Sequence, residues 1–289
     1  MKTRVITAIF ILAIAIPVVV FSEYVIYPIA LSLLSGLAVF EMLRVIKFHK
    51  CLRISLPAYI IALAMPICSY LVFNNAEYAE YRIVYLLLMF VALFIYLIYI
   101  MAMAVFSHGK ITVAGIGVTF LSVSYVVASF ASLSTLRYLD VQAGLYNLML
   151  VFFISWGCDT SAYFFGTFLG KHKLIPDVSP KKSVEGAIGG IIGAVGLSLG
   201  FAACVGNLSE IPTNYIAVAV CALVLSVVSQ VGDLMASLIK REFGVKDYGK
   251  LMPGHGGVMD RFDSILAVAT PLLFISLFFP PFGTVANLI

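Results

Sequence analysis

Uninterrupted apolar runs dominate this sequence, and they restrict the chain to a fold that spans a membrane. Reading for long runs between charged breaks gives nine candidate helices, each close to the roughly 20 residues that cross a bilayer. They cover residues 5–21, 24–46, 56–73, 83–106, 111–136, 145–170, 186–206, 215–237 and 264–282. The runs lack the alternation of polar and apolar residues that is typical of membrane strands. We therefore expect an all-α, polytopic integral membrane protein.

Composition excludes the other broad classes of protein. Of the 289 residues, 62% are hydrophobic and 11% are charged, whereas a soluble domain is about half apolar and about a quarter charged. So few polar residues would not cover a water-soluble fold. The cysteines lie scattered in apolar segments without a C-x-x-C pair, so they indicate neither a disulfide framework nor a thiolate metal site. These cysteines are Cys51, Cys68, Cys158, Cys204 and Cys221.

Basic residues lie almost entirely on one side of the predicted membrane, and this asymmetry orients the chain. Of the 18 Lys and Arg residues, all except Arg82 and Arg137 fall at the N-terminus or in alternate loops. The N-terminus is therefore expected in the cytoplasm and the C-terminus outside. Residues 1–21 also have the basic start and apolar stretch of a signal peptide. Because no A-x-A-like cleavage site follows, an uncleaved first span is favoured.

The distribution of polar residues divides the chain near residue 140. Residues 1–140 contain the first five predicted helices, and acids are rare inside these spans. Residues 141–289 contain the last four helices and two charged loops on the cytoplasmic side, which are 171–185 and 238–263. The second region is therefore expected to be the catalytic one.

In the first region, Glu41 lies one turn before Arg44, and the two are expected to form an interfacial ion pair. In the second region, Asp159 and Asp233 lie inside the sixth and eighth spans. A carboxylate at membrane depth is costly, so it normally faces a cavity and has a function.

Polar residues follow Asp233 along one face of the eighth helix. Ser237 and the pair Lys240–Arg241 come after it at helical spacings, so all of them share one side of the helix. A carboxylate, a hydroxyl and two cations on one stripe are suited to a site that binds an anion together with a divalent metal.

The loop before the last span adds two carboxylates and a glycine-rich run. Asp260 and Asp263 are three residues apart, which places both on one helical face, and their oxygens suit Mg²⁺ rather than soft metals. The preceding run Pro253-Gly-His-Gly-Gly257 allows close backbone approach and unusual dihedral angles. Loops that cradle phosphates require both properties. The combination indicates a site for phosphate and metal.

The loop before the seventh span supports two compatible interpretations. Ser183 is suited to cap the helix, with Glu185 as an acid in its first turn. Alternatively, the N–H groups of the helix start, with Lys181 or Lys182 nearby, would bind an anion. Glycines further along this helix indicate close helix packing. They are Gly189, Gly190, Gly193 and Gly196.

These motifs resemble those of the phosphatidate cytidylyltransferase family, the CDP-diacylglycerol synthases. The stretch from Ser237 to Asp263 resembles the family signature nearly throughout. Supporting matches are Trp156–Tyr163, Gly170–Lys173, Ser179–Gly186 and Gly232–Leu234. Three positions depart from the family pattern, namely Ser161 where Gly is common, Val184 where Trp is common and Ala236 where many members carry Glu. The last departure puts in doubt a ligand role at position 236.

The resemblance implies a nucleotidyltransferase enzyme that transfers CMP from CTP to phosphatidate, giving CDP-diacylglycerol and pyrophosphate in phospholipid biosynthesis. It implies a multi-pass protein of the cytoplasmic (inner) membrane, with its active site facing the cytoplasm and no nucleic-acid partner. It also implies dependence on Mg²⁺, and it leaves open a second cation and a homodimer.

The resemblance and the residue chemistry together assign roles to individual side chains. The predicted metal ligands are Asp233, Asp260, Asp263 and Asp159. The predicted catalytic residues are Asp233, Asp260, Lys240 and Arg241. The predicted substrate-binding residues are Ser179, Lys181, Ser183, Ser237, Lys240, Arg241, Lys246, Asp247, His255, Gly256, Gly257 and Arg261.

Two other functions compete with this interpretation. An ion-coupled transporter would use Asp159 and Asp233 as proton relays or ion ligands. However, the charged residues gather on one face, and no inverted repeat is visible between the halves. A CTP-dependent polyprenol or lipid kinase would transfer the γ-phosphate and would need a hydroxyl acceptor and a base. The composite signature from Lys240 to Asp263 favours the cytidylyltransferase.

Overall fold

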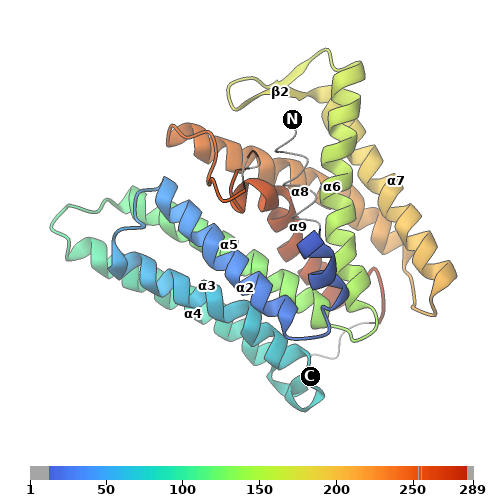
Figure 1. The fold of residues 1–289 in the computed structure, drawn as a ribbon, viewed down its shortest axis with the longest axis horizontal. Helices are drawn as coiled ribbons and strands as arrows, with labels where there is room; N and C mark the ends of the chain where they lie inside the picture. Colours follow the sequence, from blue (N-terminus) through green and yellow to red (C-terminus); the bar gives the residue numbers. More distant parts are fainter. Residues whose placement is uncertain (1–12, 253, 255, 285–289) are drawn as a thin grey trace. The chain divides into compact units, whose positions relative to one another are not determined.

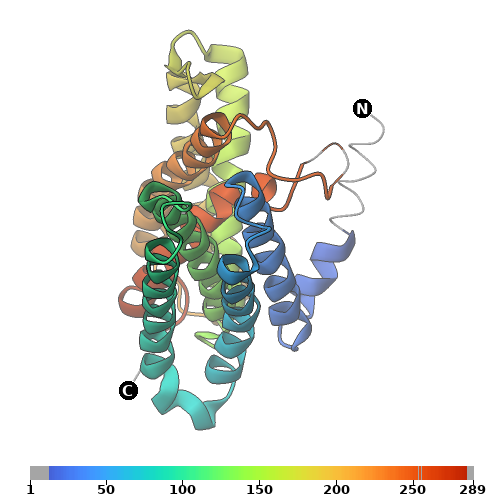
Figure 2. The ribbon, with the colours of Figure 1, turned by 90° about the vertical axis from the view of Figure 1, so that its left-hand side faces the viewer.

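The computed structural model describes residues 13–252, 254 and 256–284, and this part of the chain is mainly helical, with one short hairpin of strands (Figures 1 and 2). Within it, eight helices are long and apolar enough to cross a membrane. The all-α, polytopic membrane architecture predicted from the sequence is therefore confirmed. Residues 13–20 are also helical. They belong to the first predicted span, 5–21, whose beginning lies outside the described residues.

One compact unit comprises residues up to 135 together with the segment 243–261. Side by side in it lie α2, α3 and α4 (Figures 1 and 2). The helix α4 leaves large apolar side chains exposed, including Leu87, Phe90 and Ile95, as suits contact with lipid. The elements of this unit are α2 (Ile26–Val45), α3 (Leu52–Phe73), the 3-10 helix η1 (Ala76–Tyr81), α4 (Arg82–Val105) and most of α5 (Val113–Tyr138).

The second compact unit comprises residues 136–242 and 262–286. Its helix α7 packs along both α6 and α8. An antiparallel hairpin of β1 and β2 connects the ends of α6 and α7 (Figure 1). The elements are α6 (Gly144–Leu169), β1 (Lys173–Ile175), β2 (Ser179–Ser183), α7 (Val184–Leu208), α8 (Tyr215–Glu242) and most of α9 (Met259–Phe278).

Glycines bring α6 and α7 together, as their spacing predicts. A Cβ added at Gly189 or Gly193 would collide with side chains of α6, and one added at Gly190 would contact Ala162 and Cys158 of α6 at about 3.0 Å. The prediction is wrong for Gly196, where an added Cβ would meet open space.

Helix limits differ from the predicted spans mainly beside charged residues. The helix α8 continues to Glu242 rather than ending at 237, and α9 extends from Met259 to Phe278 rather than from 264 to 282. A hydropathy reading stops at the first charge, whereas helical hydrogen bonding does not. The basic residues Lys240 and Arg241 occupy the last turn of α8, where cations interact favourably with the helix dipole.

Both loops predicted on the cytoplasmic side are therefore shorter than expected. The loop predicted at 238–263 is reduced to residues 243–258, between α8 and α9. The loop predicted at 171–185 contains the hairpin and the first turn of α7. In addition, α3 begins at Leu52 rather than at 56.

Candidate active site

In the first unit, Asp260 organises the glycine-rich loop that precedes it. Its Oδ2 atom accepts hydrogen bonds from the backbone N–H groups of Tyr248 at 2.8 Å, Gly257 at 2.9 Å and Gly249 at 3.4 Å. The carboxylate of this predicted metal ligand, in the first turn of α9, thus binds the loop through three backbone N–H groups.

Two residues of the same loop pair with each other. Met252 and Gly256 exchange both of their backbone hydrogen bonds, at 2.9 and 3.1 Å. Gly254 and Gly256 have φ angles of +78° and +88°, which residues with a side chain rarely adopt. The unusual dihedral angles expected from the sequence are therefore confirmed at these two glycines. His255, predicted to bind substrate, lies outside the described residues.

Two charged side chains of α2 hold this loop as well. The Glu41 carboxylate accepts hydrogen bonds from the N–H groups of Val258 at 3.1 Å and Met259 at 2.9 Å. The Arg44 guanidinium donates to the carbonyl oxygen of Tyr248. The sequence predicts only an ion pair between Glu41 and Arg44. It misses the contacts of both with the loop, although an acid inside an apolar span was a signal for such a role.

In the second unit, three carboxylates come together from three helices. Asp159 of α6, Asp233 of α8 and Asp263 of α9 all interact electrostatically with one another. The hydroxyl of Ser264 donates to Asp159 Oδ2 at 3.0 Å, and the N–H of Ser264 donates to Asp263 Oδ1 at 2.9 Å. The sequence predicts four acids as metal ligands. The structure brings Asp159, Asp233 and Asp263 together, whereas Asp260 accepts hydrogen bonds from the loop backbone in the first unit.

Two lysines partly neutralise this acidic group. Lys182 Nζ forms an ion pair with Asp233, and both side chains are about a quarter exposed, at 26% and 28%. Lys240 interacts electrostatically with Asp263. The sequence favoured Lys181 as the substrate-binding residue of this strand, but its side chain is exposed. Because successive residues of a strand point to opposite faces, Lys182 is the one that reaches the acids.

The donor set of the acidic group suits Mg²⁺ chemically. Three carboxylates and the Ser264 hydroxyl offer only hard oxygen atoms. In the described part of the chain, no three side chains of the acidic, histidine and cysteine types converge closely enough to hold a metal ion as they stand. The ammonium group of Lys182 supplies a positive charge at Asp233 instead. Metal binding at Asp233 would therefore have to displace Lys182.

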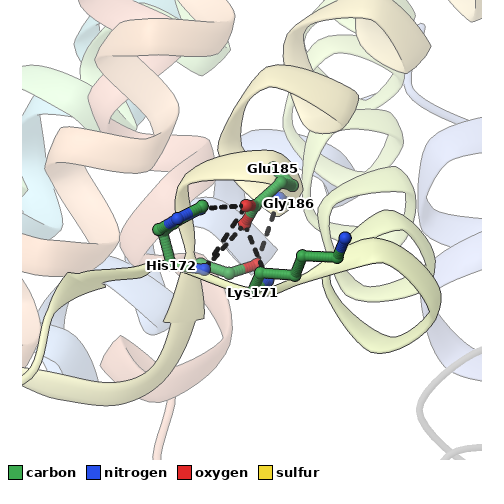
Figure 3. Close-up of polar contacts among 5 residues, drawn as sticks. Lys171, His172, Glu185 and Gly186 are labelled. Atoms are coloured by element: carbon green, nitrogen blue, oxygen red, sulfur yellow. Dashed lines mark hydrogen bonds and ion pairs between the residues drawn. The ribbon is translucent and has the colours of Figure 1, made fainter.

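Glu185 holds the base of the hairpin (Figure 3). Its carboxylate accepts hydrogen bonds from the N–H groups of Lys171 at 3.1 Å and His172 at 3.2 Å, and it contacts His172 Nδ1 at 2.6 Å. The Ser183 hydroxyl accepts from the N–H of Gly186 at 3.1 Å and caps α7. The capping interpretation of this segment is therefore confirmed.

The remaining predicted substrate-binding residues differ in exposure. Ser237 is half-buried one turn after Asp233, and Arg241 is exposed, with its Nε donating to the carbonyl of Val178 at 3.5 Å. Ser179 of β2 is half-buried. The side chains of Lys246, Asp247 and Arg261 are exposed.

Sequence reasoning missed Gln230, which lies one turn before Asp233 in α8. Its amide nitrogen donates to the carbonyl of Ala187 at 3.0 Å and to Cys158 Sγ at 3.3 Å. This side chain therefore ties α8 to α7 and α6 beside the acidic group. A glutamine inside an apolar span was the available signal.

The geometry described above is that of a helical membrane protein with grouped carboxylates, lysines and a glycine-rich loop. A sequence model of the cytidylyltransferase family matches residues 2–279, and the chain belongs to this family of nucleotidyltransferases. It is 36% identical over 275 residues to the phosphatidate cytidylyltransferase of Staphylococcus epidermidis, covering 94% of this chain and 97% of that one. It is 34% identical over 249 residues to the phosphatidate cytidylyltransferase of Bacillus subtilis, covering 86% of this chain and 88% of that one.

Proposed function

We propose that this protein transfers the CMP group of CTP to phosphatidate, producing CDP-diacylglycerol and pyrophosphate for phospholipid biosynthesis. The observation that carries the proposal is the grouping of Asp159, Asp233 and Asp263 with Lys182 and Lys240 in a member of the cytidylyltransferase family. Grouped carboxylates and cations at membrane depth suit a reaction between two phosphate compounds, one of which is a lipid.

Neither substrate requires a nucleophile from the protein. A phosphate oxygen of phosphatidate attacks the α-phosphorus of CTP, the bond from that phosphorus to the bridging oxygen breaks, and pyrophosphate leaves. Catalysis then consists mainly of positioning and electrostatic stabilisation. Because both reactants are anionic, cations must offset their repulsion. Lys182, Lys240 and Arg241 would do so from β2 and the last turn of α8.

The acids of the group would hold Mg²⁺. Asp159, Asp233 and Asp263 supply the oxygen donors, and Asp260 is proposed as a further ligand from its spacing to Asp263 in α9. Bound there, Mg²⁺ would withdraw electron density from phosphate oxygens and offset their charge. Lys182, once displaced from Asp233, would become available to phosphate.

We also propose that the site faces the cytoplasm from the inner membrane. The asymmetry of basic residues along the sequence supports this orientation. CTP is soluble and would enter from the cytoplasm, whereas phosphatidate is held in the bilayer by about 0.8 kcal/mol per buried CH₂. Lys240 and Arg241, at the end of α8, suit the depth of a phosphate headgroup.

Incubation of the purified protein with phosphatidate and CTP that is radioactive at a single phosphate tests the reaction. We expect label from the α-phosphate in the lipid product and label from the γ-phosphate in pyrophosphate. Appearance of γ-label in the lipid would instead indicate a lipid kinase.

Asp233→Asn is expected to abolish transfer, because it removes the negative charge that binds Lys182 and that the proposed metal ion requires. Asp177→Asn, in the turn of the hairpin, is the matched control and should transfer label normally.

A further inference from the structure

Glu41 is a buried acid of α2 that the proposed reaction does not use. Its side chain is 4% exposed, and its carboxylate accepts hydrogen bonds from the N–H groups of Val258 and Met259. We propose that Glu41 is a positioning residue for nucleotidyl transfer, which holds the segment formed by residues 248–252 and 256–260 in the arrangement that the reaction requires. This inference rests on the proposed role of that segment in binding substrate and metal.

The contacts of Glu41 and Asp260 are complementary. Glu41 binds two N–H groups at the start of α9, which have no carbonyl partner within the helix. Asp260 binds the N–H groups of Tyr248, Gly249 and Gly257. Five backbone N–H groups of this segment are therefore engaged by one carboxylate or the other. Arg44 adds a third connection at the carbonyl of Tyr248.

At two glycines of the segment, the Glu41 carboxylate occupies the space that a side chain would need. A Cβ added at Gly257 would collide with the carboxyl atoms of Glu41, and so would a Cβ added at Gly249. Gly257 is not among the glycines with a positive φ, so its backbone would accept other residues. The absence of a side chain at 257 is therefore explained by the position of Glu41 rather than by a turn.

The properties of the folded Glu41 variants distinguish this positioning role from a role in stability alone. Glu41→Gln preserves volume but removes the charge and leaves one carbonyl oxygen to accept two N–H groups. We expect trypsin to cut at the exposed Lys246 and Lys250 about tenfold faster than in the unaltered protein, because hydrogen bonds to charged groups are strong. We expect kcat to fall by about tenfold as well, with the helical circular dichroism retained. A loss of stability alone would lower the amount of folded enzyme and leave its kcat unchanged.

Glu77→Gln provides the matched control, because Glu77 is an exposed acid of η1 in the same unit. It should leave both the cleavage rate and kcat at the unaltered values. If Glu41→Gln does not fold, Glu41→Asp keeps the charge but is one methylene too short to reach both N–H groups, and the same two changes are expected of it.

Two results would overturn the proposal. One is a folded Glu41 variant whose kcat stays within about twofold of the unaltered enzyme, and the other is a loss of kcat without faster cleavage at Lys246 and Lys250. A separate measurement tests the segment itself: CTP with Mg²⁺ should slow cleavage of the unaltered protein at these lysines. Failure of that protection would count against the proposed function of the segment, whatever Glu41 does.

Discussion

At the scale of single residues, the ion pair of Lys182 with Asp233 bears directly on metal binding. Their ion pair connects the end of the hairpin to α8 within the acidic group. An ammonium group that neutralises a carboxylate competes with any metal ion for the same oxygens. Lys182 therefore has two proposed partners, Asp233 before metal binding and a phosphate afterwards.

Replacing Lys182 by Gln should tighten metal binding and slow the reaction at the same time. A partly exposed ion pair contributes up to about 1 kcal/mol, so removing the competitor should lower the dissociation constant of Mn²⁺ by about fivefold. The rate should fall because a cation is lost from the phosphates. Electron paramagnetic resonance of free Mn²⁺, used in place of Mg²⁺, measures the affinity without any turnover.

Lys173→Gln is the control for that measurement, because Lys173 is exposed on β1 and should not alter Mn²⁺ affinity. Unchanged or weaker binding in Lys182→Gln would contradict the competition between lysine and metal.

At the scale of elements, the helices were predictable and the hairpin was not. Apolar runs locate the spans because each helix must satisfy its own backbone in the bilayer. The segment 171–185 is polar and charged and lacks the alternation that indicates strands, so the sequence predicts a loop there. The hydrogen bonds from the N–H groups of Lys171 and His172 to Glu185 join residues more than ten positions apart. No local sequence pattern indicates such contacts.

The hairpin should loosen when Glu185 is changed to Gln. Loss of the charge weakens the hydrogen bonds from the Lys171 and His172 amides, so their hydrogen exchange should accelerate by about threefold to tenfold. Exchange measured by mass spectrometry on peptides that cover residues 171–175 reports this directly. Asp177→Asn, at the exposed turn of the same hairpin, should leave these amides as slow as before. Equal acceleration in both variants would show that Glu185 does not hold the hairpin.

At the scale of the whole molecule, the sequence predicts the acidic group but not the partners of the glycine-rich loop. Asp159 and Asp233 stand out because acids are rare in apolar spans, and Asp263 stands out by its spacing of three from Asp260. The helices bring Asp159, Asp233 and Asp263 together. The contacts of Glu41 with Val258 and Met259 span 217 and 218 residues, and no spacing rule reaches that far. The segment 243–261 consequently belongs to the same compact unit as the N-terminal helices. The sequence assigns it to the C-terminal region because of its charged and glycine-rich residues.

The orientation of the whole chain gives a further prediction. Cysteines introduced at Asp177 and Asp247, both exposed, should not react with a membrane-impermeant maleimide added to intact cells. Cysteines introduced at Glu77 and Glu210 should react, since these positions fall on the opposite side of the predicted spans. Labelling at 177 or 247 from outside would contradict the predicted orientation of the chain in the membrane. Native Cys51, Cys68 and Cys204 are replaced by Ser beforehand, because only Cys158 and Cys221 are buried.

The contact between Glu41 and the start of α9 also has a consequence in time. During synthesis, Val258 is added 217 residues after Glu41, which at about 5–20 residues per second is a delay of roughly 10 to 45 seconds. For most of that interval α2 is outside the ribosome without this partner, and its acid must be accommodated by water, lipid headgroups or the insertion machinery. The arrangement of the loop is therefore completed only when nearly the whole chain has been made.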